Sequence, residues 1–253
     1  RDAAKVQLRE WAQKKLRDGI LTAFGQIDGV AYTTSTAAQR NTWWGNNADR
    51  VMPGSVSANY AGAVFATDIG KIGATDQLSP LVLSQMKRNA QAASPKIKPL
   101  YVKEMDQEWY VVFVGSTAWR DLTEDNPTTN VMTLANRDSR IRGVDNPLFT
   151  GDSLVWDGMI IREIPEIASL ADVSGSAGCR IQPVYLAGAQ AVGLAWAQRT
   201  KSTTDTDDYE FLHGVGVQEI RGIEKLRFGT VAGADTTTPK DHGVLTCFIA
   251  AAA

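Results

Sequence analysis

The first 24 residues carry the clearest helical pattern in the chain. Apolar side chains recur there at steps of three or four residues: Ala4, Leu8, Trp11, Ala12, Leu16, Ile20, Ala23 and Phe24. This spacing places them along one side of a helix, and the opposite face carries four basic residues: Lys5, Arg9, Lys14 and Arg17. The pattern predicts an amphipathic helix over residues 3–24, roughly 30 Å long at ~1.5 Å per residue, with Gly25 or Gly29 ending it.

The following stretch, 32–75, has no sustained period of either kind. It is rich in Thr, Ser, Asn, Gly and Ala, which predicts long ordered loops with short strands. Trp43 and Trp44 stand side by side in it, and in an extended backbone their side chains would point to opposite faces. One interpretation buries them under the loop. The other places them at a contact between subunits, where Trp is enriched.

A second helix is predicted from Ser79, a favoured N-cap, and Pro80, a favoured first helical residue. Apolar residues then keep the helical period until Pro95 ends it. Residues 97–103 and 108–114 are rich in strand-forming side chains and are separated by a short polar turn. They predict two neighbouring strands of one sheet.

Two shorter elements follow. A helix is expected through residue 122, capped by Ser116 or Thr117 and closed by Asn126-Pro127. Farther along, two apolar triplets flank Asp157-Gly158. An Asp-Gly pair supplies the positive φ angles of a tight type I′ turn, so 154–161 is predicted to form a hairpin of fixed register.

The last third of the chain mixes both types of element. Residues 183–186 predict a strand, and 187–199 predict a helix of small residues whose glycines, Gly188 and Gly193, permit close packing. Residues 223–228 and 244–250 predict two more strands. The whole pattern indicates an α+β fold.

Composition describes a folded globular chain. Its 253 residues, 43% of them hydrophobic, can bury roughly 70–75% of the surface of the unfolded chain. No run approaches the ~18–20 apolar residues of a membrane-spanning helix, so no membrane association is expected. The net charge of −2 gives no overall attraction to nucleic acid, and any DNA contact must come from local basic faces.

Motifs of catalysis and metal binding are missing from the sequence. His213 and His242 have no metal-ligating neighbours, and Cys179 and Cys247 are far apart, as reduced packed thiols of a cytoplasmic protein would be. The segment 174–178 lacks the order of a nucleophile elbow, and no phosphate-binding loop occurs. The acids at 205–208 favour a solvated turn over a calcium site. We therefore expect no catalytic residues, no cofactor and no metal.

Three arginines lie close together before Asn146: Arg137, Arg140 and Arg142. Asp138 and Asp145 accompany them. One interpretation is a solvated helix face. The other is a contact between subunits, because Arg pairs bidentately with carboxylates and such pairs fix the register of an interface.

Three segments carry a family resemblance: YVVFVGSTAWRDL at 110–122, NPLFTGDSLVWDGMIIRE at 146–163 and PVYLAGAQAVGLAWAQR at 183–199. In this order, after a basic amphipathic helix and before a short apolar strand, they resemble the major capsid proteins of tailed bacteriophages, of the coliphage N-four type. The resemblance implies the Hong Kong 97-type fold, with a long spine helix, a peripheral sheet and an axial domain.

The resemblance also implies a division of the chain. Residues 1–29 would form the spine helix of the peripheral domain, 30–201 the axial domain, and 202–253 the return to the peripheral domain. The N-terminal arm and extended loop that precede the spine helix in the family are missing here. Because the chain also starts without Met, we expect the native product to be longer at its N-terminus.

The function implied by the resemblance is self-assembly into an icosahedral head shell around double-stranded phage DNA. The shell would contact this DNA without recognising its sequence. Copies would form hexamers and pentamers in the host bacterial cytoplasm, with scaffolding, portal and decoration proteins as further partners. Two alternatives remain: an encapsulin-like shell for enzyme cargo, and a small-molecule-binding α+β domain. Particles that hold protein in place of DNA would favour the encapsulin-like shell. A chain that stays monomeric at all concentrations would favour the small-molecule-binding domain.

Overall fold

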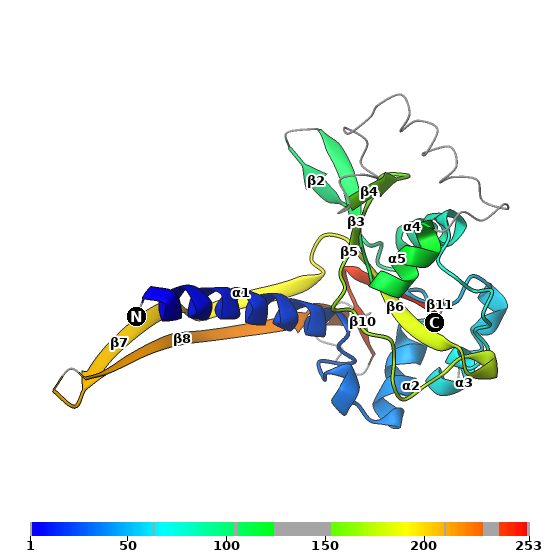
Figure 1. Ribbon diagram of the computed structural model, residues 1–253. Coiled ribbons are helices and arrows are strands. Elements are labelled where there is room, and N and C mark those ends of the chain that lie inside the picture. Colours follow the sequence, from blue (N-terminus) through cyan, green and yellow to red (C-terminus); the bar gives the residue numbers. More distant parts are fainter. Residues whose placement is uncertain are drawn as a thin grey trace, which may run out of the picture.

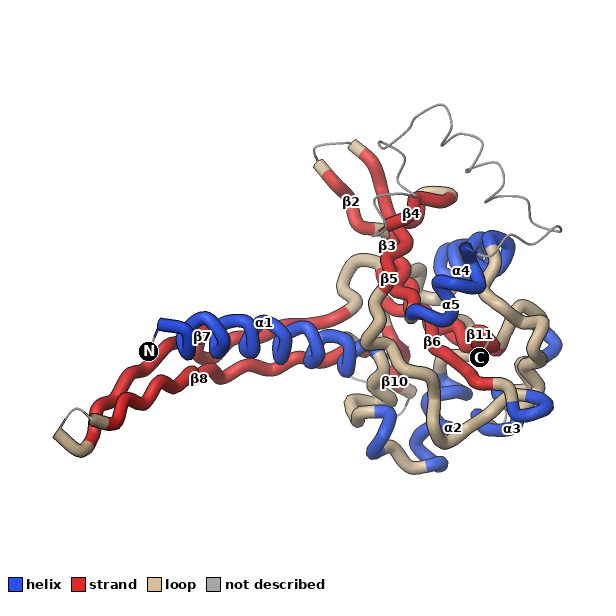
Figure 2. Tube along the Cα trace, in the orientation of Figure 1, coloured by secondary structure: helices blue, strands red, loops and turns tan. Residues whose placement is uncertain are grey.

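The structure is a computed structural model that describes residues 2–62, 64–103, 106–123, 153–209, 211–229 and 238–251. The chain forms a body and a long arm that projects from it (Figure 1). Figure 2 shows that the arm combines one helix with two strands, whereas the body holds the remaining sheet and helices.

The body is built on a mixed seven-stranded sheet in the order β1-β11-β6-β3-β5-β4, with β2 paired to β3. Pairs β1–β11 and β3–β5 are parallel, and the other pairs are antiparallel. The strands are β1 Val51–Pro53, β2 Leu100–Val102, β3 Gln107–Val114, β4 Ser153–Trp156, β5 Met159–Glu163, β6 Arg180–Ala187 and β11 Val244–Ala251.

Strand β11 lies between two apolar cores because successive side chains of a strand point to opposite faces. Leu245, Cys247 and Ile249 join the core under α4 (Pro80–Ala92) and α5 (Ser116–Thr123). Phe248 and Ala250 join the core under α2 (Ala37–Asn46) and α3 (Phe65–Ile69). Every residue of β11 is buried, as expected for a strand covered on both faces.

The arm consists of α1 (Asp2–Phe24) lying along the antiparallel pair β7 (Val192–Asp207) and β8 (Leu212–Lys225), as Figure 1 shows. At ~3.3 Å per residue the 16-residue β7 is about 50 Å long. Where the arm meets the body, β9 (Arg227–Gly229) pairs with β10 (Pro239–Asp241). Short 3-10 turns occupy Tyr32–Thr34, Ser57–Asn59 and Ser176–Gly178.

Several sequence predictions are confirmed. The first helix is α1, and the second is α4, whose N-cap Ser79 accepts a hydrogen bond from the Val82 amide. The short helix is α5; its expected end at Asn126-Pro127 lies outside the described residues. The Asp157-Gly158 turn has the positive φ angles of 47° and 72° that a type I′ turn needs.

The predicted helix over 187–199 is wrong, because most of that segment belongs to strand β7. Its residues pair with β8 from Val192 opposite Lys225 onward, and this long-range pairing overrides the helical preference of a small-residue segment. Gly188 does permit close packing: a Cβ there would lie 2.4 Å from the Lys98 carbonyl oxygen. Position 201, the predicted domain boundary, lies inside β7.

The stretch 32–75 also differs from its prediction, since it contains the helices α2 and α3. Thr36 and Gln39 form a capping box at the start of α2, a signal present in the sequence that indicates a helix. Trp43 and Trp44 therefore lie on a helix, about 100° apart around its axis, and do not face opposite sides of a strand.

Candidate assembly surface and its junction with the body

Large apolar side chains remain exposed along the arm. Helix α1 packs closely on β8, so closely that a Cβ on Gly19 would lie 2.9 Å from the Ile223 side chain. Yet Trp11, which the helical pattern places on the apolar stripe, is 53% exposed. The exposed large apolar residues of the arm are Val6, Trp11, Leu194, Tyr209, Phe211 and Ile220.

The tip of the arm is aromatic and acidic. Tyr209 and Phe211 are 95% and 83% exposed, more than any other large apolar side chain in the described residues. Asp208 and Tyr209 both have positive φ, a conformation that Asp tolerates and that is unfavourable for Tyr. The acids 205–208 are all exposed, as predicted, but Asp205 and Asp207 belong to the end of β7 and only Asp208 lies in the turn.

A buried polar cluster joins the base of the arm to the body. Lys225, the last residue of β8, places its Nζ 2.6 Å from Asp241 Oδ2, with the two side chains only 1% and 3% exposed. Trp43 on α2 donates its indole N–H to the same oxygen at 2.9 Å, and the Lys225 ammonium lies 5.1 Å from the Trp43 ring centre. The pair is thus held by groups from the arm, from β10 and from α2.

Backbone and side-chain hydrogen bonds fix this cluster further. The Asp241 amide donates to Asn47 Oδ1 at 2.8 Å, and the buried guanidinium of Arg50 donates to the carbonyl oxygens of Asp241 and His242. On the arm side, the Lys225 amide donates to Gln26 Oε1 at 3.1 Å. We name this set of residues the junction cluster.

A second Trp–Asp–Lys cluster belongs to the body alone, and its lysine, Lys71, is 38% exposed. Trp44 donates its indole N–H to Asp68 Oδ2 at 2.9 Å, and Lys71 lies 3.0 Å from Asp68 Oδ1. Burial raises the pKa of Asp68, but hydrogen bonds from Trp44, Lys71 and two backbone amides outweigh burial and bring that pKa below its ordinary value. We name Trp44, Asp68 and Lys71 the body cluster.

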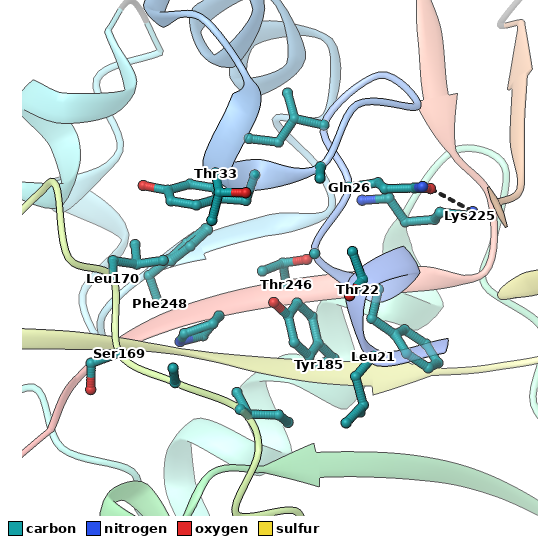
Figure 3. Close-up of a pocket in the computed structure, with 18 of the residues that line it drawn as sticks. Leu21, Thr22, Gln26, Thr33, Ser169, Leu170, Tyr185, Lys225, Thr246 and Phe248 are labelled. Atoms are coloured by element: carbon teal, nitrogen blue, oxygen red, sulfur yellow. Dashed lines mark hydrogen bonds between the residues drawn. The ribbon is translucent and has the colours of Figure 1, made fainter. Parts of the chain in front are cut away.

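A cavity of about 690 Å³ lies next to the junction cluster (Figure 3). The last turn of α1, the segment 166–172 and the sheet residues Tyr185, Thr246 and Phe248 line it. Burial raises the pKa of Tyr185 above its ordinary range. The base of the arm therefore contacts the hydrogen-bonded junction cluster on one side and the cavity on the other.

Two ion pairs lie at the edge of this cavity. Arg17 of α1 contacts Glu166 at 2.6 Å. Arg40 pairs with Asp172 and stacks over the Tyr32 ring at 4.3 Å. Burial raises the pKa of Asp172, but hydrogen bonds from Arg40 and Tyr32 bring that pKa below its ordinary value. Arg17 thus gives α1 an exposed contact with the body in addition to the buried cluster.

The five residues proposed from the sequence as subunit contacts have different outcomes. Trp43 and Trp44 are buried within the chain at 2% and 0% exposure. Arg137, Arg140 and Arg142 lie outside the described residues. Sequence reasoning missed Lys225 and Asp241 as partners of Trp43, since they are separated in the chain and belong to no local motif.

Other chemistry is sparse in the described ranges. No three His, Cys, Asp or Glu residues gather there as a metal site. The described helices include none that is both long and apolar enough to span a membrane. Both cysteines are free thiols, and Cys247 is buried in the core.

Known proteins resemble this chain along nearly its whole length. The sequence model described as "Phage capsid protein" matches residues 1–253. A major capsid protein of Pseudomonas phage KPP25 is 25% identical over an alignment of 242 residues that covers 90% of this chain and 57% of that protein. This chain therefore spans little more than half of that relative.

Solved structures agree on the fold. The capsid asymmetric unit of cyanophage Pam1 matches with a TM-score of 0.83 and 34% identity over 99% of this chain and 69% of that one. The capsid of Ralstonia phage GP4 matches with a TM-score of 0.64 and 19% identity, over 97% and 68% of the two chains, and supports the fold alone. The predicted α+β capsid fold is confirmed, and this chain belongs to the phage capsid protein family.

Proposed function

We propose that this chain is a major capsid protein subunit that associates with copies of itself into the icosahedral head of a phage. The observation that carries the proposal is the projecting arm, whose tip exposes Tyr209 and Phe211 far from the apolar cores of the body. The family and the similar capsid of cyanophage Pam1 support it.

The arm suits assembly for a physical reason. Its tip side chains extend about 50 Å from the base of β7, so the body of the same chain cannot cover them. Burying them requires another molecule, and identical copies provide a repeated interface. Many weak contacts closed by symmetry give a stable shell even when each contact is marginal. Hexamers and pentamers of the chain are the assemblies we propose.

The geometry suggests a revised division of the chain. In place of boundaries at 29 and 201, we assign α1 and β7–β8 to the peripheral domain and the seven-stranded sheet with its helices to the axial domain. Helix α1 would be the spine helix of the Hong Kong 97-type fold. The junction cluster then lies where the two domains meet.

Further partners follow from the same role. The shell would enclose double-stranded DNA, which a chain of net charge −2 can hold through local basic residues without reading its sequence. Scaffolding, portal and decoration proteins complete the proposed partners, and assembly would take place in the host cytoplasm. Arg137, Arg140 and Arg142 remain proposed contacts between subunits.

Electron microscopy and light scattering of the purified chain test the proposal. The double variant Tyr209→Ser/Phe211→Ser should stay unassembled at concentrations where the unchanged chain forms closed particles, with the same circular dichroism. Leu81→Ser, an exposed apolar residue on α4, is the matched control and should assemble normally. A chain that stays monomeric at every concentration would contradict the proposal, and particles that contain protein in place of DNA would favour the encapsulin-like alternative.

A further inference from the structure

The junction cluster connects elements that otherwise belong to separate parts of the molecule. Lys225 ends the arm strand β8, Asp241 ends β10, and Trp43 belongs to α2 of the body. All three side chains meet at a single oxygen, Asp241 Oδ2. These polar contacts are directional and tie the arm to the body, in addition to the apolar contact of Phe24 and the exposed Arg17–Glu166 pair.

Stability alone does not account for such a cluster. Apolar side chains of similar volume often replace a buried ion pair without loss, because removing two charges from water offsets much of their attraction. The cluster also leaves Asp241 Oδ1 buried without a hydrogen-bond partner among the described residues. A buried pair with these properties is best explained by the geometry that it specifies.

The surroundings leave room for the arm to turn if the cluster is lost. The cavity of about 690 Å³ lies between the last turn of α1 and the sheet, beside Lys225. In the wall of the cavity, Phe24 contacts the rings of Phe113 and Tyr185, an apolar contact with little directional preference. A rotation of about 5° at the base would move the tip of an arm of about 50 Å by roughly 4 Å.

We infer that Lys225 and Asp241 are positioning residues that fix the angle between arm and body and thereby determine the curvature of the assembled shell. This inference rests on the proposed assembly function. A repeated interface closes into a shell only when the rotation between neighbours has the right value, and otherwise it grows into open structures. An arm of variable angle would present its tip to neighbours in variable orientations.

The body cluster provides a matched control. Lys225→Met/Asp241→Asn removes the ion pair across the junction and keeps an amide oxygen to accept the Trp43 indole N–H. Asp68→Asn/Lys71→Met makes the same substitutions at the Trp44 indole within the body, where the lysine is 38% exposed. Both double variants lose one ion pair next to a tryptophan, but only the first loses a contact between arm and body.

The arm angle is measured first, on the unassembled full chain. Spin labels are attached at Tyr209→Cys and Leu81→Cys, in a chain whose free thiol Cys179 is replaced by Ser. Double electron–electron resonance then measures the distance between the tip of the arm and the body. The junction variant should broaden that distance distribution several-fold, and the body variant should leave it unchanged. An unchanged distribution in the junction variant overturns the inference. This measurement needs no assembly, so it also decides the arm angle if the chain forms no particles and the proposed function fails.

Particle diameter is measured second. Electron micrographs of the junction variant should show mixed diameters, tubes or open sheets, whereas the body variant should give the single diameter of the unchanged chain. A single normal diameter in the junction variant would refute the link to curvature. If that variant is insoluble, Trp43→Phe and Trp44→Phe make a milder matched pair, and equal, single diameters for both would refute the link in the same way.

Discussion

Trp44→Phe should lower the free energy of unfolding by about 2–3 kcal/mol. Trp44 is fully buried, and its ring lies 5.2 to 5.7 Å from those of Tyr60, Phe65 and Phe248. The substitution leaves a void of roughly 40 Å³, which costs ~1 kcal/mol at about 24 cal/mol per Å³. It also removes the indole N–H donor of Asp68, which costs roughly 1–2 kcal/mol because other donors of that carboxylate remain.

Urea denaturation of the unassembled chain, followed by circular dichroism, measures this difference. The slope of free energy against urea should not change, since the same surface is exposed on unfolding. Trp196→Phe is the control: Trp196 lies half-buried on the arm with Arg221 at 5.9 Å from its ring centre, and should cost less than ~1 kcal/mol. A Trp44→Phe chain within about 0.5 kcal/mol of the unchanged protein would mean that the buried indole hydrogen bond does not form.

Three further outcomes are expected. Gly158→Ala should destabilise the chain by ~1–2 kcal/mol because φ is +72° there, whereas Gly45→Ala in α2, with open space around its Cβ position, should stabilise it by ~0.5–1 kcal/mol; melting curves of the two variants compare them. Burial, with Arg50 and Lys98, lowers the pKa of His242 below 6.5. Protonation of His242 therefore favours the unfolded chain. As the pH falls below 6.5, the free energy of unfolding should decrease until the pH passes the pKa of the folded state. Urea titrations across that range should show a smaller decrease for the His242→Gln variant. Arg140→Glu should reduce the yield of particles in sedimentation more than it reduces the melting temperature, and normal, salt-tolerant particles would contradict a role at subunit contacts.

Elements with strong local signals could be predicted from the sequence. Helix α4 has its Ser79 cap and a proline at its first position, and the β4–β5 hairpin has an Asp-Gly turn whose conformation few other residue pairs adopt. These signals act over a few residues, so no knowledge of the rest of the chain is needed. The family resemblance extended the prediction to the fold as a whole.

The arm strands could not be predicted in the same way. Much of β7 is exposed, and its large apolar residues, Val192, Leu194 and Trp196, alternate over only five positions before a long polar run begins. Its small residues, such as Ala195 and Ala197, favour a helix locally. The pairing with β8, from Val192 opposite Lys225 to Asp207 opposite Leu212, determines the outcome and is not visible in either segment alone.

The two adjacent tryptophans show how local and long-range information combine. Their prominence is evident in the sequence, but Asp241 lies 198 residues after Trp43, and Asp68 lies 24 residues after Trp44. Because α2 turns successive side chains by about 100°, one indole N–H reaches β10 at the base of the arm and the other reaches α3 inside the body. In an extended segment the pair would point to opposite faces, and Trp43 could not contact the junction while Trp44 fills the neighbouring core. The short helix that begins at the Thr36 capping box is therefore what allows one dipeptide both to stabilise the body and to orient the arm.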